Sequence, residues 1–215
     1  TYTGATTING GTLALSGAGS LASSGIELAA NGAAFKISAT TGNRTIGDLS
    51  GVAGTTVTLG GNRLMLGTTA STSFAGVIEG AGGLNKQGSG TLTLSGNNTY
   101  TGITVVNIGT LALSDGGSLA SSGIDLAAAG AAFDISAAIG NRTIGNLVGL
   151  PDARVTLGDN SLTLGTAAST IFWGIIEGSG GITKQGSGTF VLSGASTYTG
   201  ATTINDCTLA LASAG

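Results

Sequence analysis

The stretch Gly88-Ser89-Gly90-Thr91-Leu92-Thr93-Leu94-Ser95-Gly96-Asn97-Asn98-Thr99-Tyr100-Thr101-Gly102 decides the fold of this chain. Leu92 and Leu94 alternate with threonines, which is the pattern of a strand with one buried face. Gly and Asn on both sides accept the positive φ angles of tight corners. The stretch therefore predicts a short strand between two corners.

Runs of the same kind recur along the chain and predict an all-β fold. They are short and are separated by Gly-Asn, Gly-Gly, Asp-Gly and Ser-Gly pairs, and no helical period of 3.6 residues lasts three turns. In the middle of the chain they cover residues 91–94, 103–107, 110–113, 124–127, 132–135, 142–147, 154–157, 161–164, 170–176 and 190–192.

A long internal repeat decides how these strands are arranged. Thr1-Tyr2-Thr3-Gly4 recurs at 99–102 and 197–200, a period of 98 residues without gaps. A repeat that runs straight on fits an open linear stack, and we predict a right-handed parallel β-helix. With three strands and about 24 residues per turn, one copy forms about four turns and the chain about nine. We interpret residues 1–215 as one continuous β-helix fragment, with a first copy (1–98), a second copy (99–196) and a partial third copy (197–215).

The inward faces of the strands are expected to form vertical ladders of aliphatic side chains. An isolated Gly-rich turn is costly to order, so stability is expected to come from the stacking of neighbouring turns. The predicted core leucines are Leu13, Leu15, Leu64, Leu66, Leu111, Leu113, Leu162 and Leu164.

Residues 82–106, continued by Gly109-Thr110-Leu111-Ala112-Leu113, resemble the autotransporter-associated β-strand repeat, also called the passenger-associated transport repeat. Residues 180–211 match it again, and residues 1–15 are the tail of another occurrence. The resemblance implies a passenger segment that a C-terminal translocator barrel of the same polypeptide exports through a Gram-negative outer membrane. The passenger would then be displayed on the cell surface or released. Phe190-Val191 and Cys207 depart from the repeat.

Composition excludes several other classes of protein. Pro is nearly absent and no three-residue Gly period appears, which excludes collagen, while a mean hydropathy of +0.41 and a net charge of −3 argue against disorder. No apolar run reaches the roughly 18 residues of a membrane helix, so we expect no membrane insertion of this segment. Seven scattered Lys and Arg form no basic patch, so we expect no nucleic-acid partner. Cys207 is the only cysteine and can form no internal disulfide.

The usual catalytic motifs are missing, and we predict no catalytic, cofactor or metal site. There is no His, which excludes the Ser-His-Asp triad and the common zinc motifs. Paired carboxylates remain open: Asp152 with Glu177, and Asp134 with Asp159, are each 25 residues apart and would stack if a turn had that length. Such a pair would suit a retaining glycosidase or a weak cation site.

Other recurring polar residues are interpreted as structural. Glu79 and Lys86, which recur as Glu177 and Lys184, are expected to pair across a Gly-rich corner. The arginines of the two Gly-Asn-Arg-Thr-Ile-Gly segments are expected to cover apolar surface with their stems, and the repeated tyrosines are expected to pack at a corner. These residues are Arg44, Arg142, Tyr2, Tyr100 and Tyr198.

Phe172 and Trp173 are the candidate contacts for a partner. Neighbours in a strand face opposite ways, so one of the two rings is expected outside. We predict a non-enzymatic structural or adhesive passenger segment, with a protein or glycan on a host or neighbouring cell as its partner. Two alternatives stay open: a polysaccharide-active β-helix enzyme (a lyase or glycosidase), and a secreted ligand for a host receptor.

Overall fold

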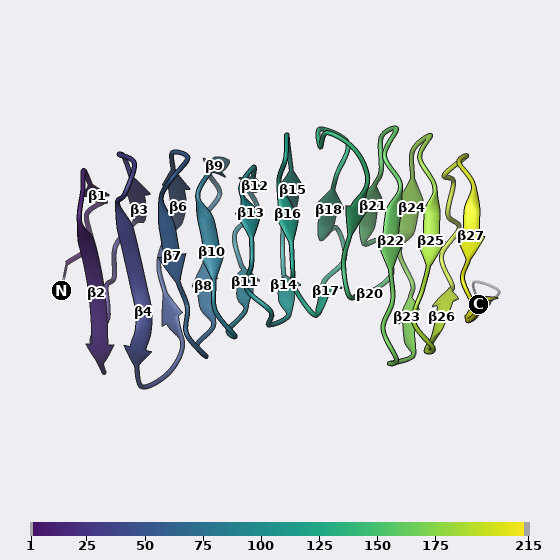
Figure 1. Ribbon diagram of the computed structural model, residues 1–215, viewed down its shortest axis with the longest axis horizontal. Helices are drawn as coiled ribbons and strands as arrows, with labels where there is room; N and C mark the ends of the chain where they lie inside the picture. Colours follow the sequence, from purple (N-terminus) through teal and green to yellow (C-terminus); the bar gives the residue numbers. More distant parts are fainter. Residues whose placement is uncertain (1, 213–215) are drawn as a thin grey trace.

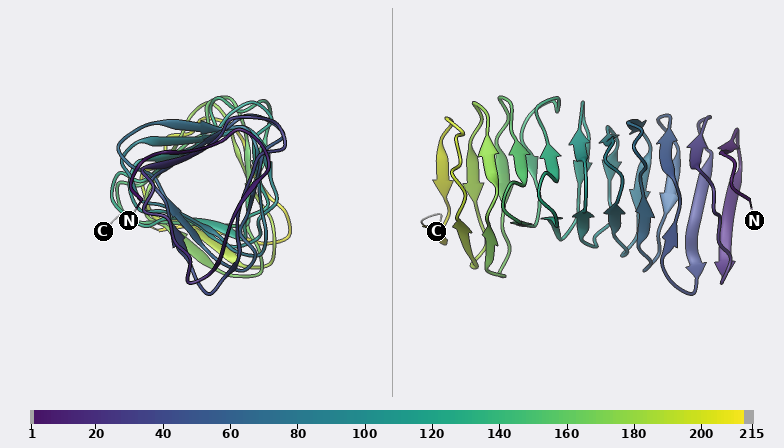
Figure 2. Two further views of the ribbon diagram at one scale, coloured as in Figure 1. Left: turned by 90° about the vertical axis from the view of Figure 1, so that its left-hand side faces the viewer. Right: turned by 180° about the vertical axis from the view of Figure 1, so that it is seen from behind.

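The computed structural model describes residues 2–212 and contains 28 strands and no helix in that range. Every paired strand runs parallel to its neighbour. The strands stack along the long axis with the two ends of the chain at opposite ends (Figure 1), and the view along the axis shows a triangular outline (Figure 2). The prediction of an all-β parallel β-helix is confirmed.

Three faces, A, B and C, make up the triangle, and the chain visits them in turn. Face A is the sheet β1 (Thr6–Ile8), β3 (Gly25–Leu28), β6 (Asp48–Gly51), β9 (Thr72–Phe74), β12 (Thr91–Leu94), β15 (Thr110–Leu113), β18 (Ala132–Asp134), β21 (Arg154–Thr156) and β24 (Ile175–Glu177). Face C is the sheet β5 (Arg44–Thr45), β8 (Leu64–Leu66), β11 (Leu84–Lys86), β14 (Thr104–Val106), β17 (Gly123–Leu126), β20 (Asn146–Gly149), β23 (Thr170–Phe172), β26 (Thr189–Leu192) and β28 (Thr208–Leu211).

Face B consists of three shorter sheets that follow one another along the axis. Its strands are β2 (Thr12–Gly17), β4 (Ala34–Thr40), β7 (Thr56–Thr58) and β10 (Val77–Glu79), then β13 (Asn97–Asn98) and β16 (Ser118–Leu119), then β19 (Arg142–Thr143), β22 (Leu162–Leu164), β25 (Ile182–Lys184) and β27 (Thr202–Ile204). The short strands at residues 97–98, 118–119 and 142–143 explain why this face is divided.

Each turn is shorter than the sequence analysis predicted. Paired residues on neighbouring strands are 19 residues apart between Leu92 and Leu111 and 23 apart between Ile26 and Leu49, not about 24. A side often needs only a three-residue strand and a tight corner, so the chain forms about ten turns rather than about nine.

The core fills the triangle with ladders of inward side chains. Six of the eight predicted core leucines are at most 1% exposed: Leu64, Leu66, Leu111, Leu113, Leu162 and Leu164. Leu13 and Leu15 are only half-buried, because β2 is the last strand of its sheet and has a neighbour on one side only.

Copies of the sequence repeat do not stack on the same face. Thr6, Thr104 and Thr202 are 98 residues apart, yet they lie in β1 on face A, β14 on face C and β27 on face B. At about 21 residues per turn, 98 residues make 98/21, or about four and two-thirds turns. Each copy is therefore rotated by two-thirds of a turn from the previous one.

Candidate functional site

Phe172 and Trp173, the two predicted contact residues, lie on opposite sides of the sheet. The expected strand over 170–176 is divided into β23 on face C and β24 on face A, with Trp173 and Gly174 at the corner between them. Phe172 is 0% exposed, whereas Trp173 is 47% exposed. Only the indole is accessible to a partner, and its role as a contact stays a prediction.

Glycines at close approaches hold this corner in place. A Cβ atom on Gly149 would lie 2.4 Å from Cε2 of Phe172, so the ring packs directly on the glycine of the preceding turn. The backbone N–H of Trp173 donates to the Gly149 carbonyl at 2.9 Å. A Cβ atom on Gly174 would lie 2.2 Å from the Ala153 carbonyl oxygen. The buried ring and the two glycines thus fix where the indole leaves the surface.

Beside the indole, three consecutive turns form a hollow of about 450 Å³, which we call the Trp173 corner. It is lined by Pro151, Asp152, Trp173, Ile175, Ser193, Gly194 and Ala195. The lining combines one aromatic ring, apolar side chains, one carboxylate and one hydroxyl. Such a mixture of an apolar wall and a few polar groups is typical of small-ligand sites.

The two polar groups of the Trp173 corner have no partners among the residues that the structure describes. Asp152 has a left-handed backbone, with φ 64°, and its carboxylate makes no hydrogen bond or ion pair within residues 2–212. Ser193 is 3% exposed, and its Oγ atom is buried without a hydrogen-bond partner in the same range. Of the two, only the Asp152 carboxylate is accessible to a ligand, because the Ser193 Oγ atom is buried beneath the surface.

An apolar row on face C, the face C stripe, adjoins this corner. It consists of the outward residues Val148, Ile171 and Val191, which pair with one another on β20, β23 and β26. Val148 is 37% and Ile171 42% exposed. The corresponding residues of the first copy are all polar: Ser50, Ser73 and Thr93.

The carboxylate pairs that the sequence analysis left open do not stack. Glu177 pairs with Thr156 on face A, and Asp134 pairs with Thr156 from the other side, so these two carboxylates are two strand spacings, about 10 Å, apart. Asp152 and Asp159 lie at corners outside the strands. The turn is about 21 rather than 25 residues long, which displaces each expected pair by about four residues.

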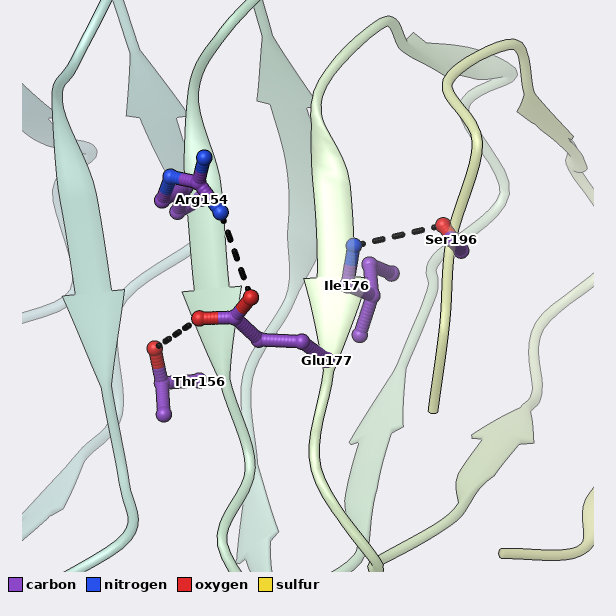
Figure 3. A network of polar contacts seen from close by, with 5 residues as sticks. All are labelled: Arg154, Thr156, Ile176, Glu177 and Ser196. Atoms are coloured by element: carbon purple, nitrogen blue, oxygen red, sulfur yellow. Dashed lines mark hydrogen bonds and ion pairs between the residues drawn. The ribbon is translucent and has the colours of Figure 1, made fainter. Parts of the chain in front are cut away.

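Glu177 is instead held by structural contacts (Figure 3). Its carboxylate accepts from Arg154 Nη1 at 3.2 Å and from Thr156 Oγ1 at 3.3 Å, and Arg154 and Glu177 side chains are 52% and 36% exposed. An ion pair this exposed contributes about 0–1 kcal/mol. In the next turn the backbone N–H of Ile176 donates to Ser196 Oγ at 3.2 Å, which ties the chain beside the Trp173 corner to β24.

The expected ion pairs of Glu79 with Lys86 and of Glu177 with Lys184 are not formed, and this prediction is wrong. Lys86 occupies an inward position between Leu66 and Val106 and is 2% exposed, so its ammonium cannot reach the outward Glu79. Its Nζ donates to the carbonyl oxygens of Gly88 and Ile108, and Lys184 Nζ likewise donates to two corner carbonyls. Burial lowers the pKa of Lys86, although Asp48 acts in the opposite direction.

The repeated arginines and tyrosines also have structural contacts. Arg44 Nη2 donates to the Gly17 carbonyl at 2.6 Å, and Arg142 Nη2 donates to the Asp115 carbonyl at 2.5 Å, so each arginine links two turns at a corner. Tyr100 is fully buried, with its hydroxyl 2.6 Å from Thr104 Oγ1, so the predicted packing at a corner is confirmed for Tyr100, whereas it is wrong for Tyr2, which is 53% exposed. Burial raises the pKa of Tyr100.

Residues 2–212 contain neither a candidate metal-binding cluster nor a candidate membrane-spanning helix. No group of three or more His, Cys, Asp or Glu side chains there could hold a metal ion. That range also contains no helix long and apolar enough to cross a membrane. Cys207 is a free thiol whose Sγ lies 3.4 Å from the Lys184 carbonyl oxygen.

Comparison with known proteins identifies the family. Residues 1–15, 84–113 and 182–211 match the passenger-associated transport repeat. Over 225 residues the chain is 39% identical to the adhesin BmaC autotransporter of Brucella suis biovar 1 (strain 1330), an alignment that covers 95% of the chain. The chain carries the passenger-associated transport repeat and is homologous to part of an autotransporter adhesin.

The chain spans about 6% of the length of that relative. No solved structure matches it significantly. The matched residues agree with the repeats recognised in the sequence, and they fall on different faces: 84–113 begins with β11 on face C, and 182–211 begins with β25 on face B. The passenger repeat therefore does not belong to one side of the β-helix.

Proposed function

We propose that this segment is displayed on the surface of a Gram-negative cell and supports adhesion to a host or neighbouring cell without catalysing a reaction. The observation that carries the proposal is the 39% identity to an adhesin autotransporter over 95% of the chain. The proposal includes contact by the segment itself, through the surface around the Trp173 corner.

The geometry supports contact rather than catalysis. Glu177, which the sequence analysis paired with Asp152 as a possible catalytic site, accepts hydrogen bonds from Arg154 and Thr156 on an exposed face. The second copy, in contrast, exposes Trp173 and the face C stripe where the first copy has small or polar residues. Exposed aromatic and aliphatic side chains in one patch are typical of interaction surfaces.

A swap of repeat copies in the full-length autotransporter tests the proposal. Replacing residues 99–196 by the sequence of residues 1–98 keeps the length and the rotation of the β-helix, because the copies align without a gap. Cells that display the swapped protein should adhere less than cells that display the unaltered one, with equal surface levels by antibody labelling and equal resistance to protease.

Deleting residues 99–196 is the matched control for a role as a spacer. The deletion joins Asn98 to Thr197, which preserves the local sequence of the repeat. If the segment only extends the passenger, the deletion lowers adhesion and the swap does not. Unchanged adhesion in the swapped protein, at equal display, would contradict contact by this segment.

A further inference from the structure

The Trp173 corner unites three features that point to one kind of ligand. Trp173 is the only Trp of the chain and presents nearly half of its surface to solvent. The Asp152 carboxylate belongs to the same hollow and has no partner within residues 2–212, and Pro151 and Ile175 add an apolar wall. A ligand for this lining needs an apolar face for the indole and hydroxyl groups for the polar atoms.

We propose that the Trp173 corner binds an uncharged glycan. The inference deepens the proposed adhesive function and rests on it. The C–H face of a pyranose ring packs against the indole face, while its hydroxyls donate to the Asp152 carboxylate. The volume of about 450 Å³ lies within the range of about 300–1,000 Å³ of small-ligand sites.

The first copy shows that this lining is not required by the fold. The positions of Pro151, Asp152 and Trp173 are held there by Ala53, Gly54 and Ala75. Val77 and Asn97 likewise stand where the second copy has Ile175 and Ala195, so five of the seven lining positions differ between copies whose strands pair in the same register.

Asp152 stands at a position whose backbone favours glycine. Gly54, its counterpart, has φ 78°, and Asp152 has φ 64°. A side chain there is strained, at a cost of order 1–3 kcal/mol that is usually found at functional sites. In the first copy Asn31 also fills the space, because a Cβ atom on Gly54 would lie 2.2 Å from its Oδ1. The second copy has Ala129 instead of Asn31, which leaves room for the carboxylate.

Charge selects among glycans. Asp152 lies in the hollow, and the chain has a net charge of −3, so a sialylated or sulfated sugar would be repelled. A neutral sugar keeps the same hydroxyl contacts without that cost. We therefore expect the corner to prefer neutral over anionic oligosaccharides.

A protein partner docked on the face C stripe fits the observations less well. The stripe extends over three strands, about 10 Å at a strand spacing of about 4.8 Å. A stable protein interface needs about 800 Å² on each side. Aliphatic docking would also leave the carboxylate of Asp152 unused. A protein partner is therefore an outcome that the experiment must separate from a glycan.

Trp173 supplies the signal for the test, because all Trp fluorescence of the chain comes from it. The chain is titrated with chitobiose, lactose and cellobiose, with 3′-sialyllactose as the anionic control and a Leu-Lys repeat peptide as the protein probe. We expect a saturable change in Trp emission, with millimolar affinity, for at least one neutral sugar. The anionic control should bind less tightly.

Variants locate the binding site. D152G keeps the fluorophore and should weaken the neutral sugar about fivefold or more by removing the carboxylate that accepts its hydrogen bonds. S193A is the matched control and should leave sugar binding unchanged, because the Ser193 Oγ atom is buried. For W173A, saturation-transfer NMR replaces fluorescence and should show no sugar signal. The double variant V148S/I171S restores first-copy residues on the stripe and should leave sugar binding unchanged.

Three results would overturn the glycan proposal. The first is the absence of any response to the neutral sugars at about 50 mM, far above the millimolar affinities expected here. The second is binding that D152G leaves unchanged. The third is a response to the peptide alone that V148S/I171S abolishes. The copy-swap adhesion assay does not depend on any of these results. The glycan proposal can therefore be refuted without refuting the adhesive function.

Discussion

Packing between Phe172 and Gly149 should make their substitutions strongly non-additive. Phe172 is completely buried, so F172A should cost about 3–5 kcal/mol. G149A brings a methyl group to 2.4 Å from the ring and should cost about 1–3 kcal/mol by overpacking. In the double variant the new methyl group occupies part of the space that the ring leaves, so its cost should be about 1–2 kcal/mol below the sum of the single costs.

Guanidinium unfolding followed by far-UV circular dichroism measures these four free energies. W173A is the matched control, because its side chain is next in sequence but half-exposed, and it should cost about 1 kcal/mol or less. Additive effects of F172A and G149A, within about 0.5 kcal/mol, would refute direct packing of the ring on the glycine. Equal costs for F172A and W173A would refute the inward and outward assignment at this corner.

Three further predictions follow from burial and stacking. L113D buries an unpaired carboxylate and should cost several kcal/mol, whereas D152N should be nearly neutral; equal unfolding midpoints would contradict this. The folded-state pKa of Lys86 lies below its ordinary value of 10.5, so between those two values the unfolded chain binds more protons than the folded chain. The free energy of unfolding, relative to that of K86M, should therefore rise with pH through that window. A difference between the two free energies that does not change with pH would contradict the burial of Lys86. Hydrogen exchange should be fastest near residues 5–15 and 205–212 and slowest near 90–165, and a flat profile would argue against an open stack.

Local strand structure could be predicted from the sequence because it depends on alternation alone. The expected strands 91–94 and 110–113 have the same bounds as β12 and β15. The prediction of a single strand over 170–176 was wrong, because the chain turns from face C to face A at Gly174. In that run the apolar residues continue on both sides of the corner, so hydrophobicity gave no signal of the break.

Contacts between turns could not be predicted, because they depend on the length of a turn. An error of about four residues in that length exceeds half of one side, so Asp152 was matched with Glu177, and the hollow to which Asp152 and Ser193 both belong was missed. Ser193 lies 41 residues from Asp152, close to two turns of about 21. Lys86 was misplaced for a different reason: the alternation in Leu84-Asn85-Lys86 points its side chain inward, but a charged residue was expected outside.

The rotation between copies shows which unit the repeat preserves. From Thr6 to Thr104 the chain passes 14 sides of the triangle, so one side takes 98/14, or 7, residues. A duplication that contains a whole number of sides, even without a whole number of turns, places each inward residue above another inward residue and each corner above a corner. The core therefore accepts the copy, but the outward side chains of the two copies face different directions. The first and second copies cannot form one continuous binding stripe, so a contact such as the Trp173 corner depends on residues that changed after the duplication.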